Sequence, residues 1–313
     1  MTGVAPTPAL DRRALAKSLT RSANASVAEI LSRWQAASEG VARRIGITGA
    51  PGTGKSTLIS HLASCRLALA ERIGVLAIDP TSPFSQGAIL GDRVRMDAVV
   101  DDDRLFIRSL ASRSSHDGLT DNIADLLAIM DVHGFDEVML ETVGVGQTDY
   151  AVRTLVDTVV LVLIPESGDQ IQAMKAGLME TADIYVINKA DLPGASRVAN
   201  EVRTVLARAH RRGTWQRRVE EASAVEPSSI EALSQVVSAH QAWVASNRQT
   251  TAVRRARAAY HAKELLARRL SELIDGAGPQ LLDLPLPAIC EELVARLGWS
   301  GTSDAGPPVL GHF

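Results

Sequence analysis

Residues 47–63 of this chain have the sequence ITGAPGTGKSTLISHLA, which is the strongest indication of its fold class. Three glycines, a proline and a lysine stand there between an apolar run and an amphipathic helical pattern. Because helix interiors disfavour Gly and Pro, their position just before that pattern indicates a specialised turn from a strand into a helix. The segment 49–56 fits the phosphate-binding pattern G-x-x-x-x-G-K-[ST], and the flanking strand and helix provide the context that this pattern requires.

Each part of this loop has a defined chemistry. Glycines let the backbone turn so that successive N–H groups point at phosphate oxygens, and the helix that follows adds its positive N-terminal end. Lys55 supplies a cation for the β- and γ-phosphates, and the Ser56 hydroxyl can ligate Mg²⁺. An ordinary glycine-rich turn explains the glycines but not a lysine and a serine at the required offset. We therefore predict a nucleoside triphosphate site formed by Gly49, Ala50, Pro51, Gly52, Thr53, Gly54, Lys55, Ser56 and Thr57.

Short runs rich in β-branched residues recur along the chain, and helical patterns separate them. Several runs are apolar throughout, as in a parallel sheet whose two faces are covered by helices. The alternation predicts an α/β fold with a doubly wound, mostly parallel sheet. The expected strands are 43–49, 73–79, 105–111, 137–144, 158–165 and 184–191.

Both flanks of this α/β region look helical. An amphipathic lead-in occupies 11–37, and helical patterns continue at about 230–246, 252–274 and 287–297. The predicted organisation is an N-terminal helical extension over 1–40, a P-loop domain over 41–247, a C-terminal helical arm over 248–300 and a flexible tail over 301–313.

The composition excludes several classes of protein. A formal net charge of −3 gives no broad reason to expect nucleic acid or an anionic membrane as a partner, and the basic segments 211–218 and 254–269 fit solvated helix faces. Cys65 and Cys290 lie far apart without metal-ligand spacing, so we expect a cytoplasmic protein without a disulfide framework or zinc site. The longest apolar run, 158–165, is too short to span a bilayer.

The base of the nucleotide is indicated by NKAD, residues 188–191, which closes an apolar strand. The Asp191 carboxylate can accept hydrogen bonds from the ring N–H and the exocyclic amino group of guanine, and adenine offers neither in that geometry. Asn188 and Lys189 would brace the loop and cover the base. An N-cap for a following helix is the simpler alternative, but the position after a strand and after a phosphate loop favours guanine. At a later strand end, Ser223, Ala224 and Val225 are suited to backbone contact with the guanine O6.

A third element, ETVGVGQ at 141–147, also follows an apolar strand. It resembles the D-x-x-G switch of GTPases with Glu in place of Asp, so Glu141 would hold Mg²⁺ through water and Gly144 would offer its N–H to the γ-phosphate. Asp79 at a strand end and Asp92 after a glycine are further candidates to ligate or orient Mg²⁺ and its waters. A helix cap or a turn residue is the alternative for each, and for Asp92 the two interpretations are evenly balanced. The predicted metal set is Ser56, Asp79, Asp92 and Glu141.

Five segments together resemble one known family. They are GAPGTGKST (49–57), DPTS with GAILGDRVRM (79–96), ETVGVGQ (141–147), PESGDQIQAMKAG (165–177) and NKAD (188–191). They are similar to the methylmalonyl-CoA mutase-associated G proteins, the MeaB/ArgK-type GTPases that chaperone adenosylcobalamin-dependent acyl-CoA mutases. The resemblance extends from about residue 10 to at least residue 233.

This resemblance implies a SIMIBI-like G domain and a homodimeric GTPase that uses GTP, GDP and Mg²⁺. It also implies that the protein binds the mutase and couples its nucleotide state to the loading of intact cofactor and the release of damaged cofactor. Adenosylcobalamin would then enter only through the partner. Family dimers use the C-terminal arm, which suits the apolar stripe Leu265, Leu266, Leu270, Leu273 and Ile274, although a helix packed on its own domain would show the same stripe.

The chain departs from the family pattern in its loops. It has SHDGL at 115–119 where the family has a glycine-rich stretch, it lacks the usual Thr-Gly-Gly run near 83–86, and Lys175 has Ala176 as its neighbour in place of a second lysine. These departures concern the partner and the stimulation of hydrolysis more than nucleotide binding. We predict Lys55, Glu141, Gln147 and Lys175 as catalytic residues, with slow intrinsic turnover that a partner raises.

Two other functions share this architecture. A metallocentre-assembly GTPase of the nickel or zinc type would need clusters of thiolates or imidazoles, whereas the two cysteines and seven histidines here are scattered. A small-molecule kinase would use the phosphate loop for phosphoryl transfer, and would yield a phosphorylated acceptor instead of free phosphate.

Overall fold

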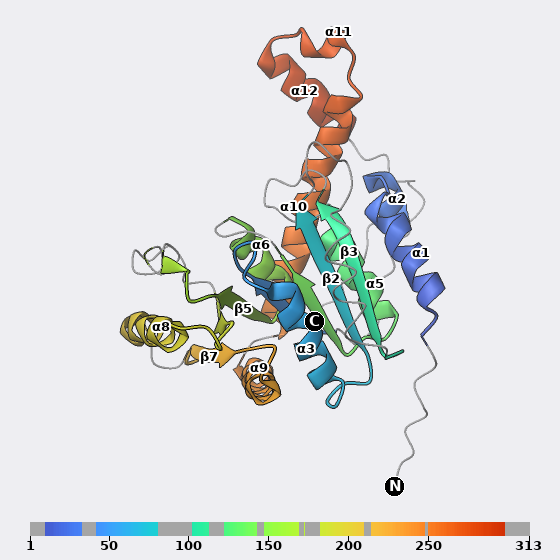
Figure 1. Cartoon of the computed structure of the whole chain (residues 1–313). Coiled ribbons are helices and arrows are strands. Elements are labelled where there is room, and N and C mark those ends of the chain that lie inside the picture. Colours follow the sequence, from blue (N-terminus) through green and yellow to red (C-terminus); the bar gives the residue numbers. More distant parts are fainter. Residues whose placement is uncertain are drawn as a thin grey trace. The chain divides into compact units, whose positions relative to one another are not determined.

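The computed structural model divides into two compact units, Met1–Ala258 and Ala259–Phe313, which are described separately. Its elements are labelled in Figure 1. The structure describes residues 10–32, 42–80, 102–112, 122–142, 147–168, 172, 182–209, 214–247 and 250–297.

The first unit is built on a seven-stranded sheet in the order β3-β2-β4-β1-β5-β6-β7 (Figure 1). Every pairing between neighbouring strands is parallel, which confirms the predicted doubly wound α/β class. The central strand β1 lies between β4 and β5, so the strand that leads into the phosphate loop is covered on both sides. The strands are β1 Arg43–Thr48, β2 Ile73–Pro80, β3 Leu105–Ser112, β4 Glu137–Glu141, β5 Thr158–Leu163, β6 Ile184–Asn188 and β7 Arg218–Ala222.

Helices cover both faces of this sheet. The helices α3 (Lys55–Arg66) and α9 (Pro227–Asn247) pack on one face. On the other face, the side-chain positions of Gly46 and Gly74 point at residues of α6 (Gln147–Leu155) and α5 (Ile123–Val132). A further helix, α8, spans Ala195–Ala209 and packs against β6 and β7.

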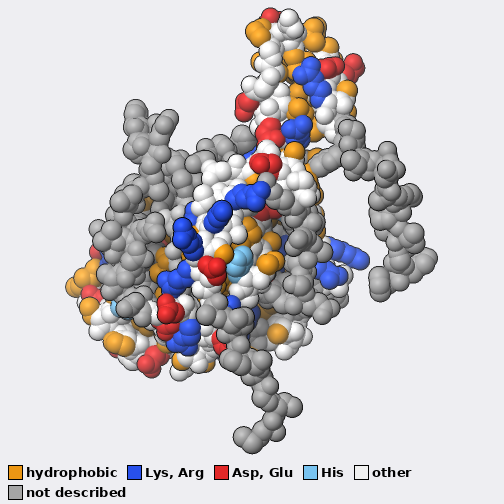
Figure 2. All heavy atoms as spheres, turned by 90° about the vertical axis from the view of Figure 1, so that its right-hand side faces the viewer, with side chains coloured by type: hydrophobic (Ala, Val, Ile, Leu, Met, Phe, Trp, Pro, Cys, Tyr) orange, Lys and Arg blue, Asp and Glu red, His pale blue; other side chains and the backbone are white. Residues whose placement is uncertain are grey.

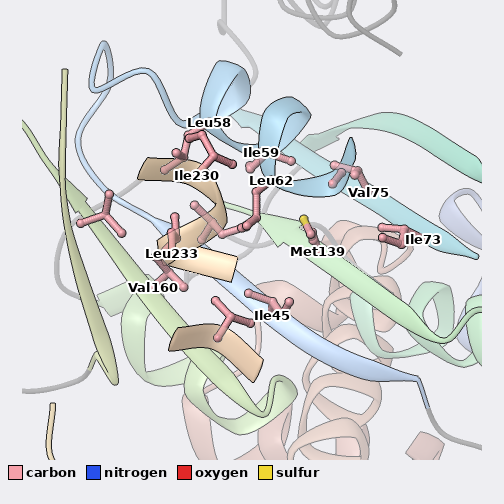
Figure 3. Close-up of a cluster of buried hydrophobic side chains, with 14 of the residues drawn as sticks. Ile45, Leu58, Ile59, Leu62, Ile73, Val75, Met139, Val160, Ile230 and Leu233 are labelled. Carbon is pink, nitrogen blue, oxygen red and sulfur yellow. The ribbon is translucent and has the colours of Figure 1, made fainter. Parts of the chain in front are cut away.

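The main core lies between the sheet and the pair α3 and α9. Figure 3 shows apolar side chains of both helices meeting those of the central strands. All of them are nearly or fully buried, and burying this much aliphatic surface is the largest favourable term in folding. The labelled members are Ile45, Leu58, Ile59, Leu62, Ile73, Val75, Met139, Val160, Ile230 and Leu233.

In the described part of the predicted lead-in, residues 11–32, the chain forms two helices. The first, α1 (Arg12–Ala23), packs against α5, and the second, α2, spans Val27–Ser32. The break has a local cause, because Ser26 and Glu29 form a reciprocal cap. The Ser26 N–H donates to the Glu29 carboxylate at 2.9 Å, and the Glu29 N–H donates to the Ser26 hydroxyl at 3.3 Å.

The second unit consists of helical segments. The long helix α10 (Thr250–Asp275) crosses the boundary at Ala258 and is followed by α11 (Pro279–Leu282) and α12 (Leu286–Leu297). Figure 2 shows hydrophobic side chains among the charged ones on the surface of this unit. The exposed apolar residues include Leu266, Ile274, Leu282, Leu284, Leu286 and Val294. The domain boundaries expected at 247 and 300 stay predictions.

Candidate functional site

The candidate site lies where the carboxyl ends of four strands meet at one edge of the sheet. The phosphate loop follows β1, Glu141 ends β4, Asn188 ends β6, and the segment that begins at Ser223 follows β7. In open α/β sheets, ligands bind in the crevice outside the carboxyl ends of the strands. This crevice forms at the topological switch point, where the connections from adjacent strands leave in opposite directions. The fold therefore brings together the phosphate, switch and guanine motifs, which are far apart in the sequence.

Two glycines of the phosphate loop combine a positive φ with a close neighbour that leaves no room for a side chain. Gly49 has φ +153°, and an added Cβ would lie 2.5 Å from the backbone oxygen of Val162. Gly54 has φ +81°, and an added Cβ would lie 2.7 Å from Nδ2 of Asn188. Gly54 is also the N-cap of α3 and provides no side-chain cap, which suits an anion at the first turn of that helix.

The lysine of the loop lies folded over the loop backbone. Lys55 is buried, and its ammonium group donates to the carbonyl oxygens of Gly49 at 3.0 Å and Ala50 at 2.9 Å. The hydroxyl of Thr53 donates to the same Ala50 oxygen at 2.9 Å. A cation is thus positioned inside the curve of the loop, next to the backbone that would surround a phosphate group.

The switch carboxylate contacts the serine of the phosphate loop. The Ser56 hydroxyl donates to Oε1 of Glu141 at 2.8 Å, and Glu141 is buried at the end of β4. A hydroxyl and a carboxylate are the hard oxygen donors that Mg²⁺ prefers, so Ser56 would suit a ligand of the ion and Glu141 would suit a group that holds it through water. The donor set of Ser56 and Glu141 therefore fits the predicted ion.

Several predicted residues are not placed by the structure. Asp92, Gly144 and Lys175 lie outside the described residues. The backbones of Asp79, near the end of β2, and Gln147, the first residue of α6, are described, but their side chains are not. Their proposed roles stay predictions.

The NKAD loop is bonded directly to the phosphate loop. Nδ2 of Asn188 donates to the Thr53 carbonyl at 2.8 Å, and the Lys189 ammonium group donates to the Gly52 carbonyl at 3.2 Å. Asn188 is buried, and Lys189 has a positive φ of 56°. The two side chains brace the NKAD loop against the phosphate loop and so fix the distance between the two motifs.

The loop after β7 makes a contact that the sequence did not predict. The Ser223 hydroxyl donates to Oδ1 of Asp191 at 2.5 Å, and Ser223 is itself buried and held by the Ser229 hydroxyl, which accepts from its N–H at 3.0 Å. Sequence reasoning expected only backbone contacts to guanine from Ser223, Ala224 and Val225. The hydroxyl orients the carboxylate that would recognise the base. The Val225 N–H donates to the Ser223 hydroxyl at 3.4 Å, and Val225 itself is 77% exposed.

A family model described as methylmalonyl-CoA mutase-associated GTPase MeaB matches residues 13–278 of the chain. The chain belongs to this family. The match covers the whole site described above and all of α10, so the resemblance noted in the motifs extends over most of the sequence.

Several curated proteins are similar to this chain in sequence. A Pyrococcus horikoshii protein with the name "Putative GTPase" is 48% identical over 186 residues, which are 59% of each chain. GTPase ArgK of Escherichia coli is 36% identical over 60% of this chain and 58% of its own. The mouse protein named methylmalonic aciduria type A homolog, mitochondrial, is 37% identical over 56% of this chain and 43% of its own. The aligned part thus spans at most about three fifths of the length of these relatives.

A solved structure supports the fold. The crystal structure titled LAO/AO transport system kinase superposes with a TM-score of 0.57 at 21% identity, covering 92% of this chain and 99% of that one.

Among the described residues there is no group of three or more His, Cys, Asp or Glu side chains arranged to hold a metal ion. In the same part of the chain, no helix is both long enough and apolar enough to cross a membrane.

Proposed function

We propose that this chain binds GTP at the described edge of the sheet and hydrolyses it to GDP and phosphate. The observation that carries the proposal is the position of Asp191, oriented by Ser223 in a loop that Asn188 ties to the phosphate loop. An ionised carboxylate accepts hydrogen bonds from the ring N–H and the exocyclic amino group of guanine, and adenine does not present two donors in that geometry. In this proposal, direct hydrogen bonds connect the loop that recognises guanine to the loop that binds the triphosphate.

Hydrolysis at this site depends on positioning and charge. The Lys55 ammonium group and the loop N–H groups would stabilise negative charge that develops on the β- and γ-phosphate oxygens. Ser56 and Glu141 are the residues that would hold Mg²⁺, whose charge further stabilises those oxygens when the ion is bound. Gly144, Gln147 and Lys175 are proposed to act from the switch loops, with Gln147 the candidate for orienting the attacking water. Intrinsic turnover is expected to be slow, and partner stimulation of GTPases reaches about 10³–10⁵-fold.

We further propose that the partner is an adenosylcobalamin-dependent acyl-CoA mutase and that the protein acts as a homodimer. The description of the matching family and the name of the mouse relative support the partner. The exposed apolar residues of the second unit, which include Leu266 and Ile274 of the predicted stripe, support dimerisation, because a protein interface would bury such side chains. In this proposal, the nucleotide state gates loading of the mutase cofactor and release of damaged cofactor.

The substitution Asp191→Asn tests the guanine assignment. An amide donates where the carboxylate accepts, so we expect affinity for GTP to fall about 100-fold as two charge-assisted hydrogen bonds are lost, and affinity for xanthosine triphosphate to rise. Isothermal titration with both nucleotides in the presence of Mg²⁺ measures this exchange. The matched control is Asp275→Asn, an exposed carboxylate of the second unit, which should change neither affinity. Unchanged GTP affinity in the Asp191 variant would overturn the assignment.

The partner is tested by affinity capture with a purified adenosylcobalamin-dependent acyl-CoA mutase. The full chain is loaded with GDP or with a non-hydrolysable GTP analogue, and the amount of mutase retained is compared. We expect the amount of retained mutase to differ between the two nucleotide states. The Asp191→Asn variant should not show this difference with guanine nucleotides. Equal absence of retention in both nucleotide states contradicts the partner proposal but leaves GTP binding intact.

A further inference from the structure

The carboxyl end of α3 holds a buried arginine whose donors are all used. Nε and Nη2 of Arg66 donate to the two carboxylate oxygens of Glu137 at 2.6 and 2.5 Å, a forked pair in which neither side chain is more than 1% exposed. The other donors reach α9, where they contact the Ser234 carbonyl at 2.9 Å, the Ser238 hydroxyl at 3.1 Å and the Gln241 amide oxygen at 3.0 Å. These five residues are called the hub below. Because a buried guanidinium is stable only when fully paired, the hub holds α3, β4 and α9 in one arrangement.

The hub and the nucleotide site lie at opposite ends of the same two elements. Alternate residues of a strand share one face, and on β4 these are Glu137, Met139 and Glu141. Glu137 contacts Arg66 at the end of α3, Met139 packs in the core with α3, and Glu141 contacts Ser56 at the start of α3. The strand and the helix therefore run in opposite directions, side by side, with a polar tie at each end.

The two ties have matching spans. From Ser56 to Arg66 the helix advances by about 15 Å at 1.5 Å per residue. From Glu137 to Glu141 the strand advances by about 13 Å at 3.3 Å per residue. A slip of α3 by one residue along β4 would move Ser56 by about 1.5 Å, which is enough to break its 2.8 Å contact with Glu141.

We propose that Arg66 is a positioning residue for the nucleotide site, which sets the separation of the Ser56 hydroxyl and the Glu141 carboxylate from the far end of α3. The inference rests on the proposed function, because those two groups are the ones assigned to Mg²⁺. Helix α9 contributes Ser234, Ser238 and Gln241 to the hub. In the first turn of the same helix, the Ser229 hydroxyl accepts a hydrogen bond from the Ser223 N–H. The same hub thus supports the elements that carry the phosphate, Mg²⁺ and guanine contacts.

The test measures how much Mg²⁺ the full chain needs to bind a fluorescent N-methylanthraniloyl derivative of GDP. In Arg66→Met the aliphatic length is kept and the forked pair is lost, and Arg43, 3.2 Å from Glu137, still faces the carboxylate. We expect the Mg²⁺ concentration for half-maximal tightening of nucleotide binding to rise roughly tenfold, the size typical of losing a group that orients a metal ligand. Arg66→Lys, which keeps the charge but not the fork, should fall between this variant and the parent.

The matched control is Arg44→Met. It breaks another buried pair, in which Arg44 contacts Asp131 at 2.6 Å and joins β1 to α5 instead of α3. Both variants are expected to melt at lower temperature, but only the Arg66 variants should shift the Mg²⁺ requirement. Should Arg66→Met not fold, Glu137→Gln gives the same comparison, because it keeps the shape of the side chain and removes its charge.

The possible outcomes separate the two proposals. A parent protein that binds no guanine nucleotide defeats the proposed function. A parent that binds, together with Arg66 and Glu137 variants that melt lower but need the same Mg²⁺ as the parent within twofold, defeats the positioning role and leaves a purely structural pair.

Discussion

Charged side chains have different partners at the two ends of the strands, which are called here the carboxyl edge and the amino edge of the sheet. At the carboxyl edge, hydrogen bonds join charged groups to neutral ones: Lys55 donates to backbone carbonyls, and Glu141 and Asp191 accept from hydroxyl groups. At the amino edge, Glu137 and Asp183 meet arginine side chains. The contacts named at the amino edge pair two charges, whereas those named at the carboxyl edge join a charged group to a neutral one beside the proposed nucleotide site.

This difference predicts how function and stability divide between the edges. A buried ion pair that loses one partner leaves an uncompensated charge and costs about 3–5 kcal/mol of stability. A charged group bonded to a hydroxyl or a carbonyl costs less stability when it is removed, but its ligand loses a strong contact. Variants at the carboxyl edge should therefore impair binding, and variants at the amino edge should impair folding, with Arg66 as the one residue expected to do both.

The largest effect is expected for Lys55→Ala. Losing the ammonium group removes charge-assisted bonds to the phosphates, and we expect affinity for GTP to fall by about 10³-fold, or roughly 4 kcal/mol. Isothermal titration with GTP and Mg²⁺ measures the affinity, and thermal unfolding without nucleotide measures the stability, which should change little. Lys263→Ala, at an exposed position of α10, is the control and should leave both unchanged. A Lys55 variant that loses stability but keeps its affinity would break the contrast between the edges.

The next effect concerns Asp183, which directly precedes β6 and contacts Arg153 and His240. Burial alone would raise the pKa of Asp183, yet the contacts from His240 and Arg153 outweigh it and hold that pKa at about 2, below the ordinary value of 3.8. Because the pKa is lower in the folded state, the ionised group stabilises the fold above about pH 4. That contribution, about 2 kcal/mol, is lost as the pH falls from about 4 to about 2.

Urea unfolding at several pH values tests this contribution. The indole rings of Trp215 and Trp243 lie 4.8 and 6.0 Å from the ring of His240, so their fluorescence reports on the same cluster. The free energy of unfolding of the parent should fall more steeply below pH 4 than that of Asp183→Asn. Parallel pH profiles for the two proteins would show that the amino-edge carboxylate contributes no pH-dependent stability. Guanine nucleotide affinity at pH 7 should be the same in both.

Sequence patterns predicted the parts of the site whose geometry is set by neighbouring residues. The phosphate loop and NKAD are each contiguous, and a glycine at a left-handed position or an aspartate after a strand has the same local consequence in any similar fold. Apolar runs predicted the strands for the same reason, since burial of both faces leaves a plain pattern in the sequence. The six expected strands lie in the structure where the sequence places them, whereas β7, whose sequence is RVEEA, has no apolar run and was not among them.

Contacts between distant residues could not be predicted in this way. Arg66 and Glu137 are 71 residues apart, and each looks in the sequence like an ordinary solvated charge. Ser223 and Asp191 are 32 residues apart and meet only because β6 and β7 pair in register. The break between α1 and α2 did carry a local signal, the S-x-x-E pattern at 26–29, which helical periodicity alone does not reveal.

The smallest effect is expected for Ser223→Ala, which sharpens the comparison within the carboxyl edge. Removing the hydroxyl takes away the bond that orients Asp191 while leaving the carboxylate and its charge in place. One neutral donor to a carboxylate is worth about 1 kcal/mol, so affinity for GTP should fall about fivefold. Ser228→Ala removes an exposed hydroxyl in the first turn of α9 and serves as the control.

A double-mutant cycle decides whether Ser223 acts through Asp191. If it does, Ser223→Ala should cost nothing further in GTP affinity once Asp191→Asn is present, because the carboxylate that it orients is gone. Full additivity would mean that Ser223 contributes by a separate contact, such as the backbone contact to guanine that the sequence predicts. Since both residues belong to the carboxyl edge, neither single variant should lower the melting temperature by more than about 2 °C, a shift that corresponds to about 1 kcal/mol in a domain of this size.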